Sequence, residues 1–254
     1  MLFSLVATGI AMLVAEIIGK ETATVFTNWI FLPIPGILVV LSVFSVKRYG
    51  ITGSHGKAWI FFAIFSAMWF IAEQIWAIME MFYSQKPFPS IADLFYVVGY
   101  PAYFLFTILY LQPVKNAITK KMIITSLLIA IAILIPNLYM TFENNSDENG
   151  FAVAVGAFYP IADAIVLVPA ILGVMLFLGG KVNFLWSLML LGIICEVVAD
   201  TGFQYFSLDN SYYTGHPVDI LFLWSYILFS FGVYDHVNLF KTKQKSLSDK
   251  ESLR

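Results

Sequence analysis

Apolar residues in this chain come in long runs separated by short polar segments. Runs of roughly 20 apolar residues are long enough to cross a lipid bilayer as helices. Because lipid cannot hydrogen-bond to exposed amide groups, such segments must pair their backbone internally. We therefore predict an all-α, polytopic membrane helix bundle, in which Pro33, Pro160 and Pro169 kink their helices. About eight transmembrane helices are expected, over residues 2–19, 27–46, 58–83, 92–112, 121–140, 151–178, 183–206 and 218–239.

The composition fits a chain whose solvent is mostly lipid. Hydrophobic residues make up 60% of the 254 positions and charged residues only 12%, compared with about 25% charged in soluble domains. The net charge of −2 gives no indication of nucleic-acid binding. The only cysteine, Cys195, cannot form a disulfide within the chain. No basic residues precede the first run, so we expect a retained helix rather than a cleaved signal peptide.

Lysine and arginine are concentrated in alternate connections between the predicted helices. Twelve of the 14 fall on one side, in the connections after the second, fourth and sixth helices and in the tail, whereas Lys20 and Lys86 fall on the other. Positively charged connections stay in the cytoplasm, so we predict a multi-pass cell-membrane protein with both termini cytoplasmic. The membrane domain is placed at residues 1–240 and a basic cytoplasmic tail at 241–254.

The second half of the membrane domain resembles the first, with matched positions 123 to 127 residues apart. Each copy would hold four helices, an even number, so both insert with the same orientation. Parallel repeats imply a pseudo-two-fold axis along the membrane normal, with a binding site between the halves. The predicted repeats cover about residues 1–115 and 116–240. The matches are Phe31 with Phe158, Gly56 with Gly180, Glu73 with Glu196, Phe82 with Tyr205, Asp93 with Asp219, and Tyr100 with Tyr226.

Acidic residues within the apolar runs are the strongest functional signal, since a carboxylate at the bilayer centre costs at least ~2.5 kcal/mol. Most of them fall between mid-span and the outer ends of their helices, often with Trp or Tyr three or four residues away, on the same helix face. Carboxylates beside aromatic faces suit a cation, and they also suit protons. We expect an outward-facing pocket. Its predicted ligand-binding residues are Glu73, Trp76, Glu80, Asp93, Tyr96, Tyr100, Tyr159, Asp163, Glu196, Asp200, Asp219 and Tyr226.

Each of these residues also has a structural interpretation. Buried carboxyls can tie helices together through hydrogen bonds, and for Glu73, Asp163 and Glu196 the two interpretations are balanced. Asp93 and Asp219 follow Ser90 and Pro217, so helix capping is favoured there. Glu16 and Asp200 are interpreted as structural. Tyr83, Tyr212, Tyr213 and Trp29 are expected to belong to an interfacial aromatic belt.

Metal and cofactor chemistry has little support in the sequence. His216 precedes Asp219 by three residues and could join it, with Asp93 or Glu80, in a hard-metal site, but a lone loop histidine is the commoner case. The sequence lacks nucleophile-elbow, zinc-protease and phosphate-loop motifs. We predict no cofactor, and we favour a non-enzymatic role.

The segment Ser90 to Tyr96, followed by Gly99-Tyr100-Pro101, resembles part of a multi-helix membrane sensory domain found N-terminal to GGDEF diguanylate cyclase domains and some histidine kinases. Tyr159-Pro160 with Asp163, and Asp200 with the later Asp219 and Tyr226, resemble further segments of that domain. The resemblance covers roughly residues 60–235 and implies a sensory input domain. Those proteins carry a cytoplasmic output domain, whereas a 14-residue basic tail follows here, so the resemblance implies a separate partner.

The leading hypothesis is a membrane sensor or ligand-binding module. A small polar or cationic ligand would enter from outside, and the signal would pass to a separate cytoplasmic protein. The alternatives are a secondary transporter, which would need a path to the cytoplasmic side, and a membrane-embedded lipid enzyme, which would need a lateral opening. A structural subunit of a membrane complex is the least specific alternative. The expected partners are membrane lipids, the ligand and the cytoplasmic protein, with no nucleic acid.

Overall fold

The computed structural model describes residues 1–85, 88–144, 150–208 and 210–251; side chains are described for these ranges except at 143–144, 208 and 239–251. The regular structure of the described residues is entirely helical. Most of the predicted tail continues the last helix, and residues 252–254 lie outside the described part. The elements are α1 (Leu2–Ile18), α2 (Lys20–Ile30), α3 (Pro33–Tyr49), α4 (Gly53–Tyr83), α5 (Ile91–Leu111), the 3₁₀ turn η1 (Gln112–Ala117), α6 (Lys120–Asn144), α7 (Gly150–Phe177), α8 (Asn183–Leu208) and α9 (Asp219–Glu251).

Seven helical stretches in the described residues are long and apolar enough to cross a membrane, counting α2 and α3 as one stretch. The prediction of an all-α, multi-pass membrane protein is therefore confirmed at this level. Helix α1 has 17 residues, which gives a length of about 25 Å at ~1.5 Å per residue. A bilayer core is about 30 Å thick, so an eighth span at α1 stays a prediction.

The first predicted spans differ from the observed helices at two breaks. Gly19, with φ of 150°, separates α1 from α2, and α2 begins at Lys20 rather than at residue 27. A turn at residues 31–32 then separates α2 from α3, which begins at Pro33. Proline has no N–H to donate and disfavours helical geometry in the preceding residue. Pro33 therefore starts a new helix here instead of kinking a continuous one.

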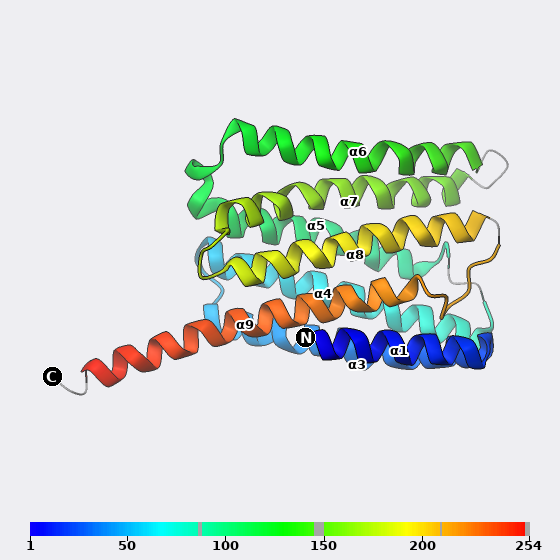
Figure 1. Ribbon diagram of the computed structural model, residues 1–254, viewed down its shortest axis with the longest axis horizontal. Coiled ribbons are helices and arrows are strands. Elements are labelled where there is room, and N and C mark those ends of the chain that lie inside the picture. The colour runs from blue at the N-terminus through cyan, green and yellow to red at the C-terminus, as the bar shows by residue number, and fades with distance from the viewer. Residues whose placement is uncertain (86–87, 145–149, 209, 252–254) are drawn as a thin grey trace.

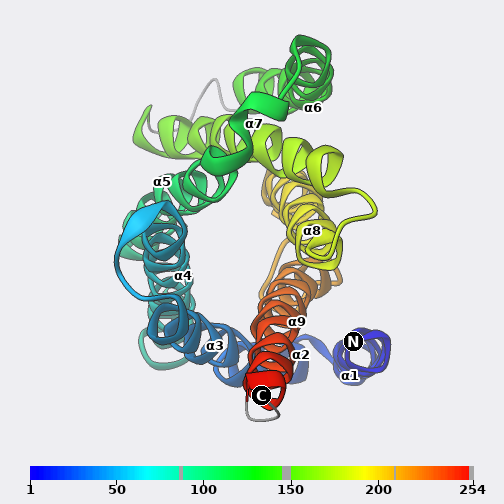
Figure 2. The same cartoon turned by 90° about the vertical axis from the view of Figure 1, so that its left-hand side faces the viewer.

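The long helices lie side by side along the longest axis of the molecule (Figure 1). Viewed from one end, α3, α4, α5, α7, α8 and α9 form a ring, with α6 outside it next to α7 and α1 outside it near α9 (Figure 2). Consecutive ring helices pack on one another, and the pairs α5–α7 and α3–α9 join the two halves of the chain. The ring brings residues from both predicted repeats to a common interior.

Close approach within the ring depends on glycines that face large rings. At Gly173 in α7, a Cβ atom would lie 1.8 Å from the ring of Trp186 in α8, and at Gly99 in α5 it would lie 2.3 Å from Trp69 in α4. Small residues let membrane helices pack closely, because lipid provides no hydrophobic force between them. These two contacts fix the spacing of neighbouring ring helices.

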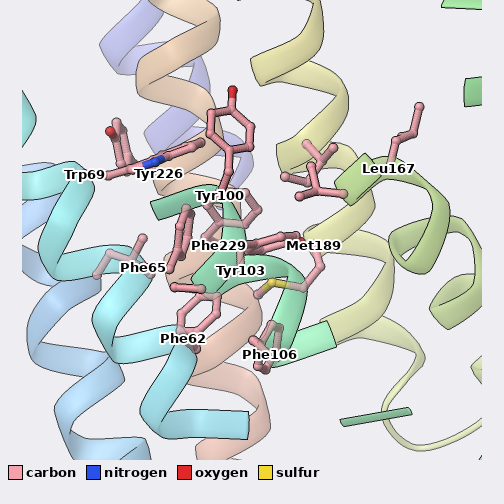
Figure 3. Close-up of a cluster of buried hydrophobic side chains, with 14 of the residues drawn as sticks. Phe62, Phe65, Trp69, Tyr100, Tyr103, Phe106, Leu167, Met189, Tyr226 and Phe229 are labelled. Atoms are coloured by element: carbon pink, nitrogen blue, oxygen red, sulfur yellow. The ribbon is translucent and has the colours of Figure 1, made fainter. Parts of the chain in front are cut away.

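A cluster of fully buried aromatic side chains fills the middle of the ring (Figure 3). Phe62, Phe65, Phe106 and Phe229 are inaccessible to solvent, and Tyr103 is 1% exposed. We call these five residues the aromatic plug. On one side of it lie Trp69, Tyr100 and Tyr226.

The two ends differ in charge, as the sequence predicts. Lys47, Arg48, Lys115 and Lys181 lie at or beside the connections at the end from which α9 projects, which we call the basic end. The opposite end carries the segments 84–90 and 208–218 within the described part of the chain. Which end faces the cytoplasm stays a prediction.

Candidate functional site

A cavity of about 600 Å³ occupies the ring interior at the end opposite the basic end. Exposed residues Ser84, Gln85 and Asn210 are among its lining residues, so it reaches the surface at these positions. Its volume falls in the ordinary range for small-molecule sites, roughly 300–1,000 Å³. Every one of the predicted ligand-binding residues lines this cavity, which is where the structure brings them together: Glu73, Trp76, Glu80, Asp93, Tyr96, Tyr100, Tyr159, Asp163, Glu196, Asp200, Asp219 and Tyr226. Their binding role stays a prediction.

The cavity wall is acidic, and its described part has no basic side chain. Seven of the lining residues have carboxyl side chains, and none of the described lining residues is Lys, Arg or His. Charges removed from water are unfavourable unless they are paired or neutralised. Each of these carboxyls therefore needs a proton, hydrogen-bond donors or a positive charge beside it.

One group of carboxyls surrounds Tyr100. Its hydroxyl lies 2.9 Å from Oδ1 of Asp163 in α7 and 3.0 Å from Oδ2 of Asp200 in α8. Because a phenol has one hydrogen, it donates to one carboxyl, and a hydrogen bond with the second requires that carboxyl to carry a proton. Asp163 is 3% exposed and Tyr100 is 4% exposed. The structural interpretation of Asp200 is therefore incomplete, since Asp200 also lines the cavity next to Asp163.

A second group involves α4, α8 and α9. Tyr226 donates to Oε1 of Glu73 at 2.7 Å. Glu196 in α8 accepts a hydrogen bond from Ser225 of α9 and is 4% exposed. Glu73 is only partly buried, so it offers its carboxyl to the cavity contents.

Two acids at the starts of their helices line the cavity and bind nearby donors. Asp93 forms a capping box at the start of α5, where it accepts from the N–H of Ser90 at 2.6 Å, and it also accepts from the Tyr159 hydroxyl. Asp219, the first residue of α9, accepts from the N–H of Gly215 at 2.7 Å. The capping prediction is confirmed for Asp93. At Asp219 the carboxyl instead binds Gly215, which precedes the helix.

The segment 210–217 covers part of the cavity and is tied to α1 and α2. Thr24 donates to the carbonyl of Thr214 at 2.7 Å. Tyr213 donates to Glu16 and lies 4.4 Å from the Lys20 ammonium, measured to its ring centroid. Glu16 thus serves the structural role expected for it. Gly215 has φ of 98° and packs against the backbone of Ala23, a contact that a larger residue would block.

The assignment of Tyr212 and Tyr213 to an interfacial belt alone is wrong, because both line the cavity. The Tyr212 hydroxyl donates to Oδ1 of Asp219 at 3.1 Å. Burial, and after it the neighbouring Asp219 carboxylate, raises the pKa of Tyr212 well above its ordinary value. Trp29 and Tyr83 are 61% and 68% exposed, as expected for belt residues.

Sequence reasoning also missed polar residues without a charge. Asn28 donates to Oε2 of Glu80 at 2.8 Å, and Thr214 accepts from the indole of Trp76 at 3.1 Å. Thr27 lines the cavity too, is 3% exposed, and its hydroxyl has no hydrogen-bond partner among the described residues. An isolated Thr or Asn in an apolar run is the signal that could have revealed Thr27 and Asn28.

The suggested metal site does not assemble. His216 packs its ring against Phe206, with centroids 4.2 Å apart, and is not among the cavity-lining residues. Asp219 meets Gly215 and Tyr212 instead. Within the described part of the chain, no group of three or more His, Cys, Asp or Glu side chains is placed to hold a metal ion.

Comparison of the chain with protein-family models, with curated proteins and with solved structures finds no match. The resemblance to a sensory domain of cyclases and histidine kinases therefore stays a prediction. Function has to be argued from the cavity and its surroundings.

Proposed function

We propose that this protein is a membrane sensor that binds a small polar or cationic ligand in the acidic cavity and signals to a separate cytoplasmic partner. The single observation that carries the proposal is the meeting of seven carboxyls with aromatic walls in one cavity open at the surface. In this proposal the cavity faces outward, since the positive-inside rule places the basic end in the cytoplasm.

The closed floor of the cavity favours a receptor over a transporter. Below Tyr100 and Tyr226 lies the aromatic plug, whose members are buried and pack ring against ring, with Phe62 and Phe106 centroids 4.8 Å apart. A transporter needs a conformation in which such a plug opens to the other side. The plug blocks a polar path to the basic end in the conformation described.

Helix α9 offers a direct route from the cavity to the basic end. It begins at Asp219 and carries Tyr226 at the cavity floor. Further along, His236 stacks on Trp59 of α4, with centroids 5.2 Å apart, and its Nε2 lies 3.4 Å from the Tyr110 hydroxyl. A ligand that favours one position of α9 over another would change these contacts, which is what signalling requires.

The test uses the purified full chain and a panel of amines, quaternary ammonium ions and neutral polyols, with thermal unfolding as the readout. Members that bind should raise the unfolding temperature of the native protein. The double variant Glu73→Gln with Glu196→Gln should lose this stabilisation, because both carboxyls line the cavity. The matched control is Glu21→Gln, which changes an exposed acid outside the cavity.

An unchanged ligand response in the double variant would reject the pocket. Accumulation of the same ligand in proteoliposomes would favour the transporter. Co-purification of a cytoplasmic signalling protein, altered by the ligand, would support the sensor.

A further inference from the structure

Two similar aromatic pairs lie at the cavity, and each joins a residue from one half of the chain to a residue from the other. In the first, Tyr226 meets Phe31 edge-to-face, with ring centroids 6.1 Å apart and an interplanar angle of 89°. In the second, Tyr100 meets Phe158 in the same way, at 5.9 Å and 81°. The matches of the predicted repeat pair Phe31 with Phe158 and Tyr226 with Tyr100. The similar geometry of both pairs supports a pseudo-two-fold relation between them.

Each tyrosine presents its hydroxyl to carboxyl groups. Tyr226 reaches Glu73, and Tyr100 reaches Asp163 and Asp200. We call Glu73 with Tyr226 the first acidic subsite, and Asp163, Asp200 and Tyr100 the second. The first is built from α4 and α9 and the second from α5, α7 and α8. A single cavity thus has carboxyl groups contributed by two different parts of the ring.

None of the described lining residues is basic, so the cavity favours a positively charged ligand. Because there are two acidic subsites, it favours a ligand with two separate positive groups. A compact single cation would satisfy one subsite and leave the other without a positive partner. A metal ion fits poorly, because Ca²⁺ takes six to eight oxygen ligands and Mg²⁺ prefers a tight octahedral shell, and no cluster of three acids is placed for one in the described chain. Aromatic walls favour ammonium groups, which interact with ring faces.

Thr27 supplies a second, independent indication of a missing partner. It lines the cavity and is 3% exposed, yet its hydroxyl has no hydrogen-bond partner among the described residues. A buried polar atom without a partner is costly. An ammonium has three N–H donors and no acceptor, so it can give one hydrogen to a carboxyl and another to a hydroxyl oxygen.

We infer that the ligand is a linear aliphatic diamine or polyamine, with one ammonium at the first acidic subsite and the other at the second. The inference rests on the proposed function and names the ligand class of the same cavity. The hydrocarbon chain between the two ammonium groups would lie against the aromatic floor, which includes Trp69. The charge on each end would be balanced by carboxyls already held in place by tyrosine hydroxyls.

The test compares ligands of matched shape on the full chain in nanodiscs of zwitterionic lipid. 1,4-Diaminobutane and spermidine carry two or more charges, 1-aminobutane carries one, 1,4-butanediol carries none, and Mg²⁺ is a compact dication. Binding is measured by calorimetry and by the shift in unfolding temperature. The diamine should bind at least about tenfold more tightly than the monoamine, because it makes a second charged contact.

Single variants test the two ends separately. Glu73→Gln and Asp200→Asn should each reduce the preference for diamine over monoamine to about one, whereas Glu21→Gln should leave it unchanged. Tyr226→Phe removes only a hydroxyl and should weaken the first subsite in the same direction. It serves as the second variant if a carboxyl substitution prevents folding.

The outcomes separate this inference from the proposed function. Equal binding of monoamine and diamine, or tighter binding of Mg²⁺ than of the diamine, overturns the diamine inference while the pocket stands. If amines have no effect but another member of the wider panel stabilises the native protein and not the Glu73→Gln, Glu196→Gln variant, the diamine inference likewise fails alone. If no member of either panel binds, both fail.

Discussion

At the scale of single residues, the cavity relies on neutral donors to hold its acids. Tyr100, Tyr159, Tyr212 and Tyr226 each donate a hydroxyl to a cavity carboxyl. Burying a phenol costs less free energy than burying an ammonium or guanidinium group, since a phenol has no charge to desolvate. These neutral donors bring no positive charge of their own to the carboxyls.

Removing the Tyr100 hydroxyl should destabilise the protein. Tyr100→Phe leaves Asp163 and Asp200 without their shared partner, and the loss of such a buried hydrogen bond costs about 1–3 kcal/mol. The matched control is Tyr103→Phe, because the Tyr103 hydroxyl has no hydrogen-bond partner among the described residues. Thermal unfolding of both variants in detergent measures the difference. Equal stability of the two would contradict the role assigned to Tyr100.

The residues of the cavity were largely predictable because charge in an apolar run has few explanations. Glu73, Asp163 and Glu196 could be identified from the cost of burying a carboxyl alone. Thr27 and Asn28 could not, because uncharged polar residues in a membrane helix also pack against their own backbone. Tyr212 was misjudged because only the fold of the 210–217 segment turns its hydroxyl towards Asp219.

At the scale of elements, the spacing of α7 and α8 depends on one glycine. The Trp186 ring lies over Gly173 and is fully buried, so it has little room to move. Gly36 in α3 differs, since a Cβ there would meet only Phe70, at an ordinary 3.6 Å. Both glycines lie within helices, where alanine is otherwise favoured by about 0.5–1 kcal/mol.

Substituting Gly173 and Gly36 by alanine tests how tightly the helices pack. Gly173→Ala should lower the free energy of unfolding by about 1–3 kcal/mol or more, as overpacked cores do. Gly36→Ala should be neutral or slightly stabilising, because its new methyl finds space. Chemical or thermal unfolding in the same detergent compares them. A stable Gly173→Ala variant would show that the α7–α8 spacing can adjust.

The length of the apolar runs predicted which segments are helices, but it did not predict where each helix begins and ends. The runs that became α4 to α8 were predicted within a few residues, since each is bounded by polar or glycine-containing segments. The last run was predicted to end at residue 239, whereas α9 continues to Glu251. The break at 31–32 was predicted only as a kink, because a proline can either kink a helix or end it. Lys20 begins α2 although it is charged, since charged residues are tolerated near membrane surfaces where their side chains reach water.

At the scale of the whole molecule, the two ends of the bundle differ in the sign of their charged residues. Lysine and arginine collect at the basic end, whereas the carboxyl-lined cavity opens at the other. The sequence predicted this polarity from its charges. It could not predict the ring of six helices, because which helices pair depends on contacts such as α3 with α9, far apart along the chain.

Cysteine labelling tests the orientation. In a Cys195→Ser background, which removes the only native thiol, Ser211→Cys and Asn116→Cys place single exposed thiols at opposite ends of the bundle. A membrane-impermeant maleimide applied to intact cells should label position 211 and leave position 116 unlabelled until the cells are permeabilised. The reverse pattern would place the cavity on the cytoplasmic side.

The length of α9 has a mechanical consequence. Its 33 residues correspond to about 50 Å of unbroken helix, and it projects past the other helices at the basic end (Figure 1). A helix resists bending over this distance, so a tilt of a few degrees about its middle would displace the far tip by ångströms, without any rearrangement along the way. A protein bound to that tip would therefore be moved by any tilt of α9 that starts at the other face of the bilayer.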